Sequence, residues 1–346
     1  MKLPALLVSD LHLTASVDDE YRWDLFRQLR EEVRNHGVKT LVCLGDTTDA
    51  KDYHSSSLVN RIVDGFCSLR DLVDEVIVLM GNHDYLKDGQ PYLSFLNHIP
   101  GIKYVTTIHS DLDGDLPCLW LPHTRNPGAS WADMHDLSWY EYVFMHQTVS
   151  GSIADNGFTM HGDGSDACFL HWKGDLPAIW SGDIHVPQTL RVSGGAKVNY
   201  VGSPYHVHFG DKFEPRSALL ITKQGSHRDI ELVFPKRHSI KMDSRSNLAR
   251  ISKQWDLHKG DQAVIGITLG LEDQHAWPRI RRQVERWAEE QEIIVRDLTL
   301  TVDKAAGGVS SKGEGTVSRT PEQALLEYVE REGLGPDAYQ SAAELL

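Results

Sequence analysis

A series of short apolar runs, each bounded by polar residues, is the feature of this sequence that most constrains its fold. The runs lie in the segments PALLVSD, TLVCLGD, EVIVLMGNHD, LPCLWLPH, YEYVFMHQ, AIWSGDIH, KVNYVGSP and SALLIT. They are four to eight residues long and rich in Val, Ile and Leu, which is typical of buried strands. Such strands need layers of structure against them, so we expect a folded protein with a substantial sheet.

Helical patterns separate the first of these runs. In YRWDLFRQLREEVRNHG, the apolar residues Trp23, Phe26, Leu29 and Val33 recur every three or four positions, and Gly37 follows as a stop signal. The segment SSSLVNRIVDGFCSLRDLV repeats this pattern. The chain therefore begins strand, helix, strand, helix, strand, and an α/β fold is predicted.

The sequence changes character after about residue 238. QAVIGITLGL has the pattern of a strand, WPRIRRQVERWAEEQ that of an amphipathic helix with Ile280, Val284 and Trp287 on one face, and EIIVRDLTLTV that of another strand. We therefore predict a main domain over residues 1–237 and a small βαβ-like capping domain over 238–304. The glycine- and serine-rich residues 305–319 have the composition of a flexible linker.

The last segment, residues 320–346, is predicted to form two short helices. It opens with Thr-Pro-Glu, a helix-start signal, and breaks at Gly333. Two short helices behind a flexible tether cannot bury their apolar faces alone. They either fold back on their own domain or dock on a partner, and the apolar candidates for docking are Leu325, Leu326, Tyr328 and Val329.

Composition excludes several classes of protein. Hydrophobic residues make up 40% of the 346 residues and charged residues 24%, which excludes a disordered chain. No stretch approaches the roughly 18 apolar residues of a membrane-spanning helix, and no signal-peptide cleavage site follows the N-terminus. We expect a cytoplasmic protein, located in the host cytoplasm if it comes from a phage. Reduced thiols are expected at the four dispersed cysteines, Cys43, Cys67, Cys118 and Cys168.

Potential metal ligands follow five of the predicted strands. Ligands of open α/β sheets bind outside the carboxyl ends of the strands, so these side chains are expected to meet at one edge. Each alone is more commonly a helix cap or an ordinary histidine, but their joint occurrence in this order predicts a metal site. The residues are Asp10 and His12, Asp46, Asn82 and His83, His146, and Asp183 and His185.

Oxygen and imidazole ligands suit the hydrolysis of phosphoesters. The reaction needs a nucleophile at neutral pH and compensation of charge on the phosphorus oxygens, and two divalent ions about 3.5 to 4 Å apart supply both. A bridging carboxylate offsets part of the repulsion between the ions. One central acid with a ligand set on each side is therefore expected.

The motif series DLH, GDTTD, GNHD, MHQ and GDIH resembles the calcineurin-like metallophosphoesterases. The segments YVGSPYHVHFGDKFEPRSALLI and GDIHVPQ are similar to those of the Mre11/SbcD nucleases within that superfamily, as are the cap and the tethered tail. The resemblance covers nearly the whole chain. It implies two sheets flanked by helices in a four-layer αββα arrangement, with the small capping domain and the helical tail appended.

The resemblance also implies a ligand set for two divalent ions, Mn²⁺ or alternatively Mg²⁺, bridged by Asp46. One ion would be held in addition by Asp10, His12 and His185. The other would be held by Asn82, His146 and Asp183. In the same pattern His83 would protonate the leaving oxygen or steady the transition state, and Asp84 would orient His83. Asp49 would contact the substrate, bond His83 or cap the following segment.

Asp183 departs from the family pattern, which usually has histidine at this position. Aspartate is a competent oxygen ligand for Mn²⁺ or Mg²⁺, so we expect binding to be retained with a shifted metal preference. The alternative is that Asp183 only caps a turn and the second ion binds weakly or not at all.

The resemblance implies a homodimer that acts on DNA and a tail that docks on an SMC-like ATPase of the Rad50/SbcC type. The formal charge of −14 argues against unaided attraction to DNA, and such a partner would supply basic surface. Candidate phosphate contacts, each of which is otherwise an ordinary surface residue, are Arg125, Lys173, Arg191, Lys212 and Arg216. His123, His206 and His208 are expected to be structural or substrate-side residues.

The predicted function is therefore a Mn²⁺-dependent DNA exonuclease or endonuclease subunit. Two alternatives remain open from the sequence. One is a stand-alone phosphoesterase that acts on small phosphodiesters or monoesters. The other is a non-catalytic scaffold, which the Asp183 replacement motivates.

Overall fold

The computed structural model describes residues 1–51, 53–86, 89–134, 136–162, 164–169, 171–172, 176–211, 216–243, 246 and 248–303. Met1–Val302 form one compact unit. The predicted linker and tail lie outside the described residues from position 304 onward. So do two of the predicted phosphate contacts and the four predicted docking residues, which are Lys173, Lys212, Leu325, Leu326, Tyr328 and Val329.

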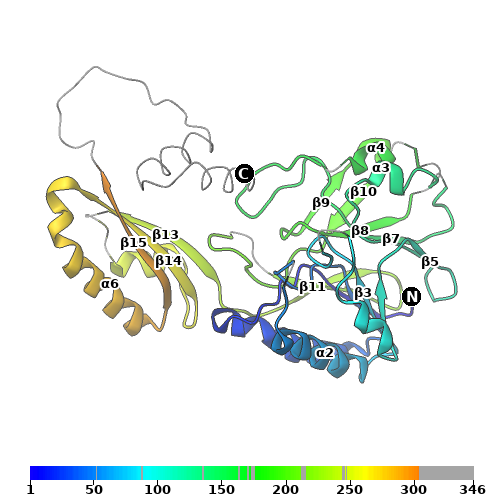
Figure 1. The fold of residues 1–346 in the computed structure, drawn as a ribbon, viewed down its shortest axis with the longest axis horizontal. Helices are drawn as coiled ribbons and strands as arrows, with labels where there is room; N and C mark the ends of the chain where they lie inside the picture. The colour runs from blue at the N-terminus through cyan, green and yellow to red at the C-terminus, as the bar shows by residue number, and fades with distance from the viewer. Residues whose placement is uncertain are drawn as a thin grey trace, which may run out of the picture. The chain divides into compact units, whose positions relative to one another are not determined.

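The first sheet has six strands in the order β12-β11-β1-β2-β3-β4 (Figure 1). Strands β1 to β4 run parallel, whereas β11 and β12 pair antiparallel at one edge. The strands are β1 (Ala5–Val8), β2 (Thr40–Cys43), β3 (Glu75–Leu79), β4 (Ile102–Val105), β11 (Ser217–Ile221) and β12 (His227–Glu231). The parallel part matches the predicted alternation of strands and helices.

The second sheet also has six strands, in the order β5-β6-β7-β8-β10-β9. Its four central strands run parallel and its two edge strands antiparallel. The strands are β5 (His109–Asp111), β6 (Cys118–Leu121), β7 (Tyr142–His146), β8 (Ala178–Gly182), β9 (Gln188–Arg191) and β10 (Lys197–Tyr200).

Helices cover the outer faces of both sheets. Helices α1 (Leu25–His36) and α2 (Ser56–Arg70) pack on the first sheet through a cluster that includes Phe26 and Phe66. The short helix α4 (Ser165–Phe169) packs on the second through Phe169, and the short helix α3 (Pro127–Ser130) contacts α4. A third apolar cluster lies between the sheets. The predicted four-layer αββα fold is confirmed, and α1 ends at Gly37, which has a φ of 59°.

Four short 3₁₀ helices complete the described elements, and three of them belong to the αββα layers. These three are η1 (Val17–Asp24), η2 (Ser94–His98) and η3 (Ser193–Gly195). In the described part of the chain, no helix combines the length and apolarity needed to cross a membrane. Cys43 and Cys118 are buried free thiols, as expected of reduced core cysteines.

The region predicted to form the cap has its own sheet, ordered β13-β14-β15, and its own apolar cluster. Its elements are β13 (Arg237–Asp243), α5 (Leu248–Gln254), β14 (Gln262–Gly270), η4 (Leu271–Ala276), α6 (Trp277–Gln291) and β15 (Ile294–Asp303). Helix α6 lies along one side of the sheet (Figure 1). The prediction missed β13, because its alternating apolar and polar residues, RHSIKMD, contain no continuous apolar run.

Candidate metal centre

The predicted ligands follow the carboxyl ends of five parallel strands. Asp10 and His12 follow β1, Asp46 follows β2, and Asn82 follows β3, all in the first sheet. His146 ends β7, and Asp183 and His185 follow β8, its neighbour in the second sheet. The two sheets therefore present their ligand-bearing ends to one site.

The backbone at four of these residues is left-handed. The φ angles are 55° at Asp10, 42° at His12, 52° at Asp46 and 84° at Asp183. Only six non-glycine residues of the described chain have positive φ, so these four are two thirds of them. This conformation is disfavoured for residues with a Cβ and concentrates at functional sites. The strained turns aim the side chains across the strand ends.

Glycines next to the predicted ligands let the turns approach closely. A Cβ on Gly182 would lie 2.6 Å from Nδ1 of His146, and one on Gly81 would overlap the Asp46 carboxylate. Neither contact is tolerable, because real Cβ atoms do not come within 3.0 Å of such neighbours. The glycine in each of the motifs GNHD and GDIH is therefore required by space alone.

The two oxygens of Asp46 face different histidines. Oδ1 lies 3.3 Å from Nε2 of His146, and Oδ2 lies 3.6 Å from Nε2 of His12. The backbone N–H of His83 donates to Oδ1 at 2.8 Å. Asp46 is buried, so its carboxylate stands between two groups of donors, the placement that a bridging ligand requires.

On one side of Asp46, two imidazole nitrogens converge. Nε2 of His12 and Nε2 of His185 are 3.0 Å apart, and their rings are T-shaped. Two ligand atoms about 2.1 Å from one ion and at a right angle to each other are about 3 Å apart. Oδ1 of Asp10 accepts the N–H of Asp183 at 3.0 Å. Its buried Oδ2 has no hydrogen-bond partner among the described residues.

On the other side of Asp46, His146, Asn82 and Asp183 gather. Nε2 of His146 lies 3.7 Å from Oδ1 of Asp183, which accepts Nδ2 of Asn82 at 3.1 Å. Nδ1 of His146 bonds the carbonyl of Leu44 at 2.6 Å, which leaves the lone pair on Nε2. Within the described chain, that Nε2 and Oδ1 of Asn82 are buried without hydrogen-bond partners. Oxygen and imidazole atoms left unpaired fit Mn²⁺ or Mg²⁺.

The buried carboxylates of the site lie close together and repel one another. Burial raises the pKa of the Asp10 and Asp183 carboxyls, and the neighbouring Asp46 carboxylate raises both further. Burial lowers the pKa of His185, but its bond to Asp155 and nearby carboxylates outweigh burial and raise it to about 9. Divalent cations would compensate these clustered carboxylates.

The structure corrects the predicted role of Asp84. Its buried carboxylate accepts the backbone N–H groups of Asp46 at 2.8 Å, Thr47 at 3.0 Å and Gly81 at 2.8 Å. It therefore ties the turn after β2 to the turn after β3. The side chain of His83 is oriented by another group, because its Nδ1 bonds the carbonyl of Asp49 at 2.7 Å.

A hydrogen bond to His83 was one of the three roles predicted for Asp49. Asp49 forms this bond through its backbone carbonyl and not through its side chain. Its carboxylate lies elsewhere, with Oδ1 3.3 Å from Nδ1 of His12. The bond to His12 lowers the pKa of Asp49 to about 2. Asp49 therefore orients two imidazoles of the site, His83 with its backbone carbonyl and His12 with its carboxylate.

Of the three predicted phosphate contacts that the structure describes, two are exposed and one is buried. Arg191 is exposed at the end of β9, and Arg125 is exposed with its Nε bonded to the hydroxyl of Tyr85 at 3.2 Å. Arg216 is only 3% exposed and donates to the carbonyl of His185 at 2.8 Å. A buried guanidinium bonded to the protein cannot meet a phosphate at the surface, which corrects the prediction for Arg216.

The three histidines predicted to be structural or substrate-side residues differ in how far they are buried. The ring of His123 lies 6.1 Å from that of His146, and its Nδ1 bonds the hydroxyl of Tyr85 at 3.1 Å. His206 is buried. His208 is exposed, and its ring lies 5.5 Å from that of His185.

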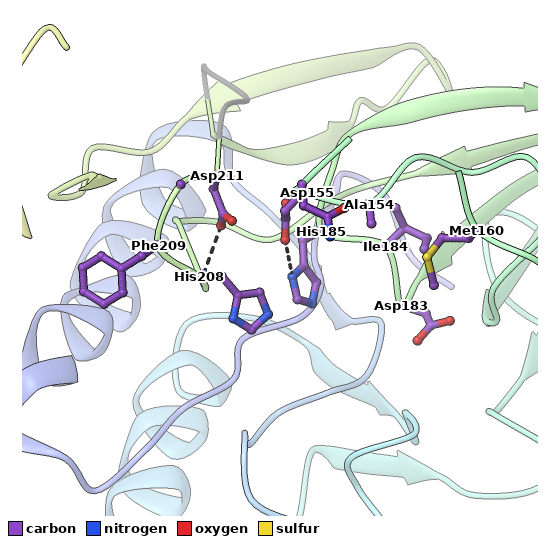
Figure 2. Close-up of a pocket in the computed structure, with 11 residues that line it drawn as sticks. Ala154, Asp155, Met160, Asp183, Ile184, His185, His208, Phe209 and Asp211 are labelled. Atoms are coloured by element: carbon purple, nitrogen blue, oxygen red, sulfur yellow. Dashed lines mark hydrogen bonds and ion pairs between the residues drawn. The ribbon is translucent and has the colours of Figure 1, made fainter. Parts of the chain in front are cut away.

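Sequence reasoning missed two side chains that contact predicted ligands. Oδ2 of Asp155 accepts Nδ1 of His185 at 2.8 Å (Figure 2). The hydroxyl of Thr148 donates to Oδ2 of Asp183. Asp155 sits in the segment SIADNG, whose composition signals only a turn. Because it lies 30 residues before His185, no local pattern links the two.

The αββα fold, with carboxylates and imidazoles gathered at its strand ends, defines this chain as a metal-dependent phosphoester hydrolase. A family model for calcineurin-like phosphoesterases matches residues 3–187, more than half of the chain. The chain belongs to this family.

Two known proteins give further comparison. Exonuclease subunit 1 of Enterobacteria phage T4 is 27% identical over 222 residues, which cover 61% of this chain and 62% of the phage protein. The chain thus matches less than two thirds of that relative. The crystal structure of a dimetal phosphatase from Danio rerio matches with a TM-score of 0.40 and 13% identity, covering 63% of this chain and 92% of that one.

Proposed function

We propose that this protein is the nuclease subunit of an Mre11/SbcD-like system, which hydrolyses DNA phosphodiesters with two Mn²⁺ ions. The observation that carries the proposal is Asp46, whose two oxygens face His146 at 3.3 Å and His12 at 3.6 Å. The similarity to a phage exonuclease subunit supports nucleic acid as the substrate. The DLH-to-GDIH motif series and the GSP segment support the same choice.

In this proposal each side chain of the site has a separate role in the reaction. The bound ions would supply an activated water and would neutralise charge on the phosphorus oxygens. His83 would act as an imidazolium: its Nδ1–H donates to the Asp49 carbonyl at 2.7 Å, so its Nε2–H is the proton available to the leaving oxygen. Asp49 steadies His12, and Asp84 fixes the turn that carries Asp46.

A nuclease assay tests the proposal directly. End-labelled duplex DNA and circular single-stranded DNA are incubated with the protein in Mn²⁺, in Mg²⁺ and in EDTA. Cleavage that requires Mn²⁺ is expected, with no cleavage in EDTA. Rapid hydrolysis of bis(p-nitrophenyl) phosphate without DNA cleavage would point to a stand-alone small-substrate phosphoesterase. Less than one bound ion per chain and no hydrolysis at all would indicate a non-catalytic scaffold.

We further propose that the protein works as a homodimer with an SMC-like ATPase of the Rad50/SbcC type in DNA end processing, repair or recombination. The formal charge of −14 supports a partner, because an acidic chain attracts the DNA polyanion poorly. The apolar residues predicted in the tail support the tail as the docking segment.

Deleting residues 320–346 is expected to abolish capture of the ATPase and to leave metal binding unchanged. The predicted ligands all lie between positions 10 and 185, so truncation removes none of them. A pull-down with the tagged ATPase measures capture, and hydrolysis of bis(p-nitrophenyl) phosphate in Mn²⁺ monitors the metal site. Retention of the truncated chain by the ATPase would contradict the proposed docking role.

A further inference from the structure

We propose that Asp155 is a positioning residue of the metal centre, which holds the His185 imidazole with its Nε2 lone pair turned toward the cation. This inference rests on the proposed two-metal function, because it assigns His185 as a ligand. Asp155 belongs to none of the sequence motifs. It reaches His185 from a loop that precedes it by 30 residues.

The geometry of the His185 ring carries the inference. Nδ1 lies 2.8 Å from Oδ2 of Asp155, and Nε2 lies 3.0 Å from Nε2 of His12. A carboxylate only accepts hydrogen bonds, so Nδ1 carries the hydrogen. In the neutral form of the imidazole, which is the form that binds a cation, the other nitrogen keeps its lone pair, and the carboxylate hydrogen-bonded to Nδ1 makes that nitrogen a better ligand.

The loop that carries Asp155 is anchored to the segment that carries His185. Oε1 of Gln188 accepts the N–H of Ile153 at 2.9 Å, and Nε2 of Gln188 donates to the Ile153 carbonyl at 2.8 Å. An antiparallel bridge between Ile153 and Thr159 closes the loop around Asp155. The segment GDIHVPQ therefore supplies both the histidine and, through its glutamine, the anchor for the partner of that histidine.

Arg216 also contacts both residues of this pair. Its Nη1 donates to the carbonyl of His185 at 2.8 Å and to the hydroxyl of Ser203 at 2.9 Å. Its Nη2 lies 3.8 Å from Asp155 and 3.5 Å from Asp211. The buried guanidinium thus fixes the backbone of His185 and balances the charge of the carboxylate that holds its ring.

A cavity of about 370 Å³ opens beside this pair, and Asp155 and His185 both line it. Figure 2 shows Met160, His208 and Phe209 around the two side chains. Space of this size admits small solutes. A formate ion could therefore take the place of the Asp155 carboxylate once the side chain has been cut back, which provides a chemical test of the role.

The test measures Mn²⁺ binding to the full-length protein by calorimetry and electron paramagnetic resonance. The wild-type chain is expected to bind two ions. In Asp155→Asn one ion should bind about 10- to 100-fold more weakly, the loss typical of removing the partner of a ligand histidine, and the other should bind as before. In Asp155→Ala, formate should restore the lost affinity, whereas in Asp155→Asn the amide occupies the space and formate should have no effect.

Asp261→Asn is the matched control. Oδ2 of Asp261 lies 2.9 Å from Nε2 of His238, and both residues are buried. The variant removes the same kind of bond far along the chain from the motifs, in the predicted cap. It is expected to lower the melting temperature without changing the affinity for Mn²⁺.

The outcomes separate the inference from the proposed function. Two ions bound with wild-type affinity by Asp155→Asn and Asp155→Ala would overturn the role of Asp155 and leave the two-metal site intact. Fewer than two ions on the wild-type chain would overturn both. A third ion that is lost in Asp155→Asn would mean that Asp155 is itself a ligand, together with His208, and would also overturn the positioning role.

Discussion

Replacing Asp46 by alanine is expected to release both divalent ions and to reduce phosphodiester hydrolysis to background. Asp46 is the carboxylate whose oxygens face both groups of predicted ligands, His12 on one side and His146 on the other. Its loss therefore weakens both sites together. The fall in turnover should exceed the factor of about 10² to 10⁴ that one proton donor contributes. Metal content by mass spectrometry and hydrolysis of bis(p-nitrophenyl) phosphate measure the effect.

Asp64→Ala is the control for this variant, because Asp64 is an exposed aspartate on α2. It should keep two ions and full turnover. Melting curves of both variants in EDTA show whether the apoprotein still folds. An Asp46→Ala protein that is folded and retains either two ions or measurable turnover would contradict the bridging role.

Replacing His83 by alanine is expected to lower turnover about 10²- to 10⁴-fold while the metal content stays at the wild-type level. The bond from Nδ1 to the Asp49 carbonyl at 2.7 Å fixes the ring, and the side chain is only partly buried. If His83 protonates the leaving oxygen, the loss should be large for DNA, whose leaving group is an alkoxide. It should be smaller for bis(p-nitrophenyl) phosphate, because nitrophenolate leaves without a proton.

His98→Ala provides the matched control, because His98 is an exposed histidine of η2. It should behave as wild type on both substrates. An equal loss on both substrates in His83→Ala would replace proton donation with a charge-stabilising role. Unchanged turnover would remove His83 from the mechanism.

The sequence predicted best those features that depend on a short stretch of chain. The apolar runs predicted the buried strands, because only strands covered on both faces can be apolar throughout. The 3.6-residue period predicted α1, and Gly37 marked its end. The position of a polar side chain directly after a strand predicted which residues would meet, since the carboxyl ends of parallel strands share one edge. Hence Asp10, Asp46 and Asp183 lie together as expected.

The individual side-chain contacts between distant segments were not predicted, and neither was strand β13. Strand β13 alternates apolar and polar residues and has no run to reveal it. Asp84 was expected to orient its neighbour His83, but its carboxylate reaches instead to the backbone of Asp46, 38 positions away. Arg216 was grouped with surface cations because charge is visible in a sequence and burial is not.

The sequence by itself determined the alternation of strands and helices and the set of side chains that converge, because hydrophobic period and strand-end position are local properties of the chain; the αββα layering followed from the resemblance to the family. The tertiary structure alone decided which atoms face each other. It placed one oxygen of Asp46 near His12 and the other near His146. It also brought the Asp155 carboxylate to Nδ1 of His185. The physical reason is that a hydrogen bond depends on position to a fraction of an ångström, and packing of distant segments sets that position.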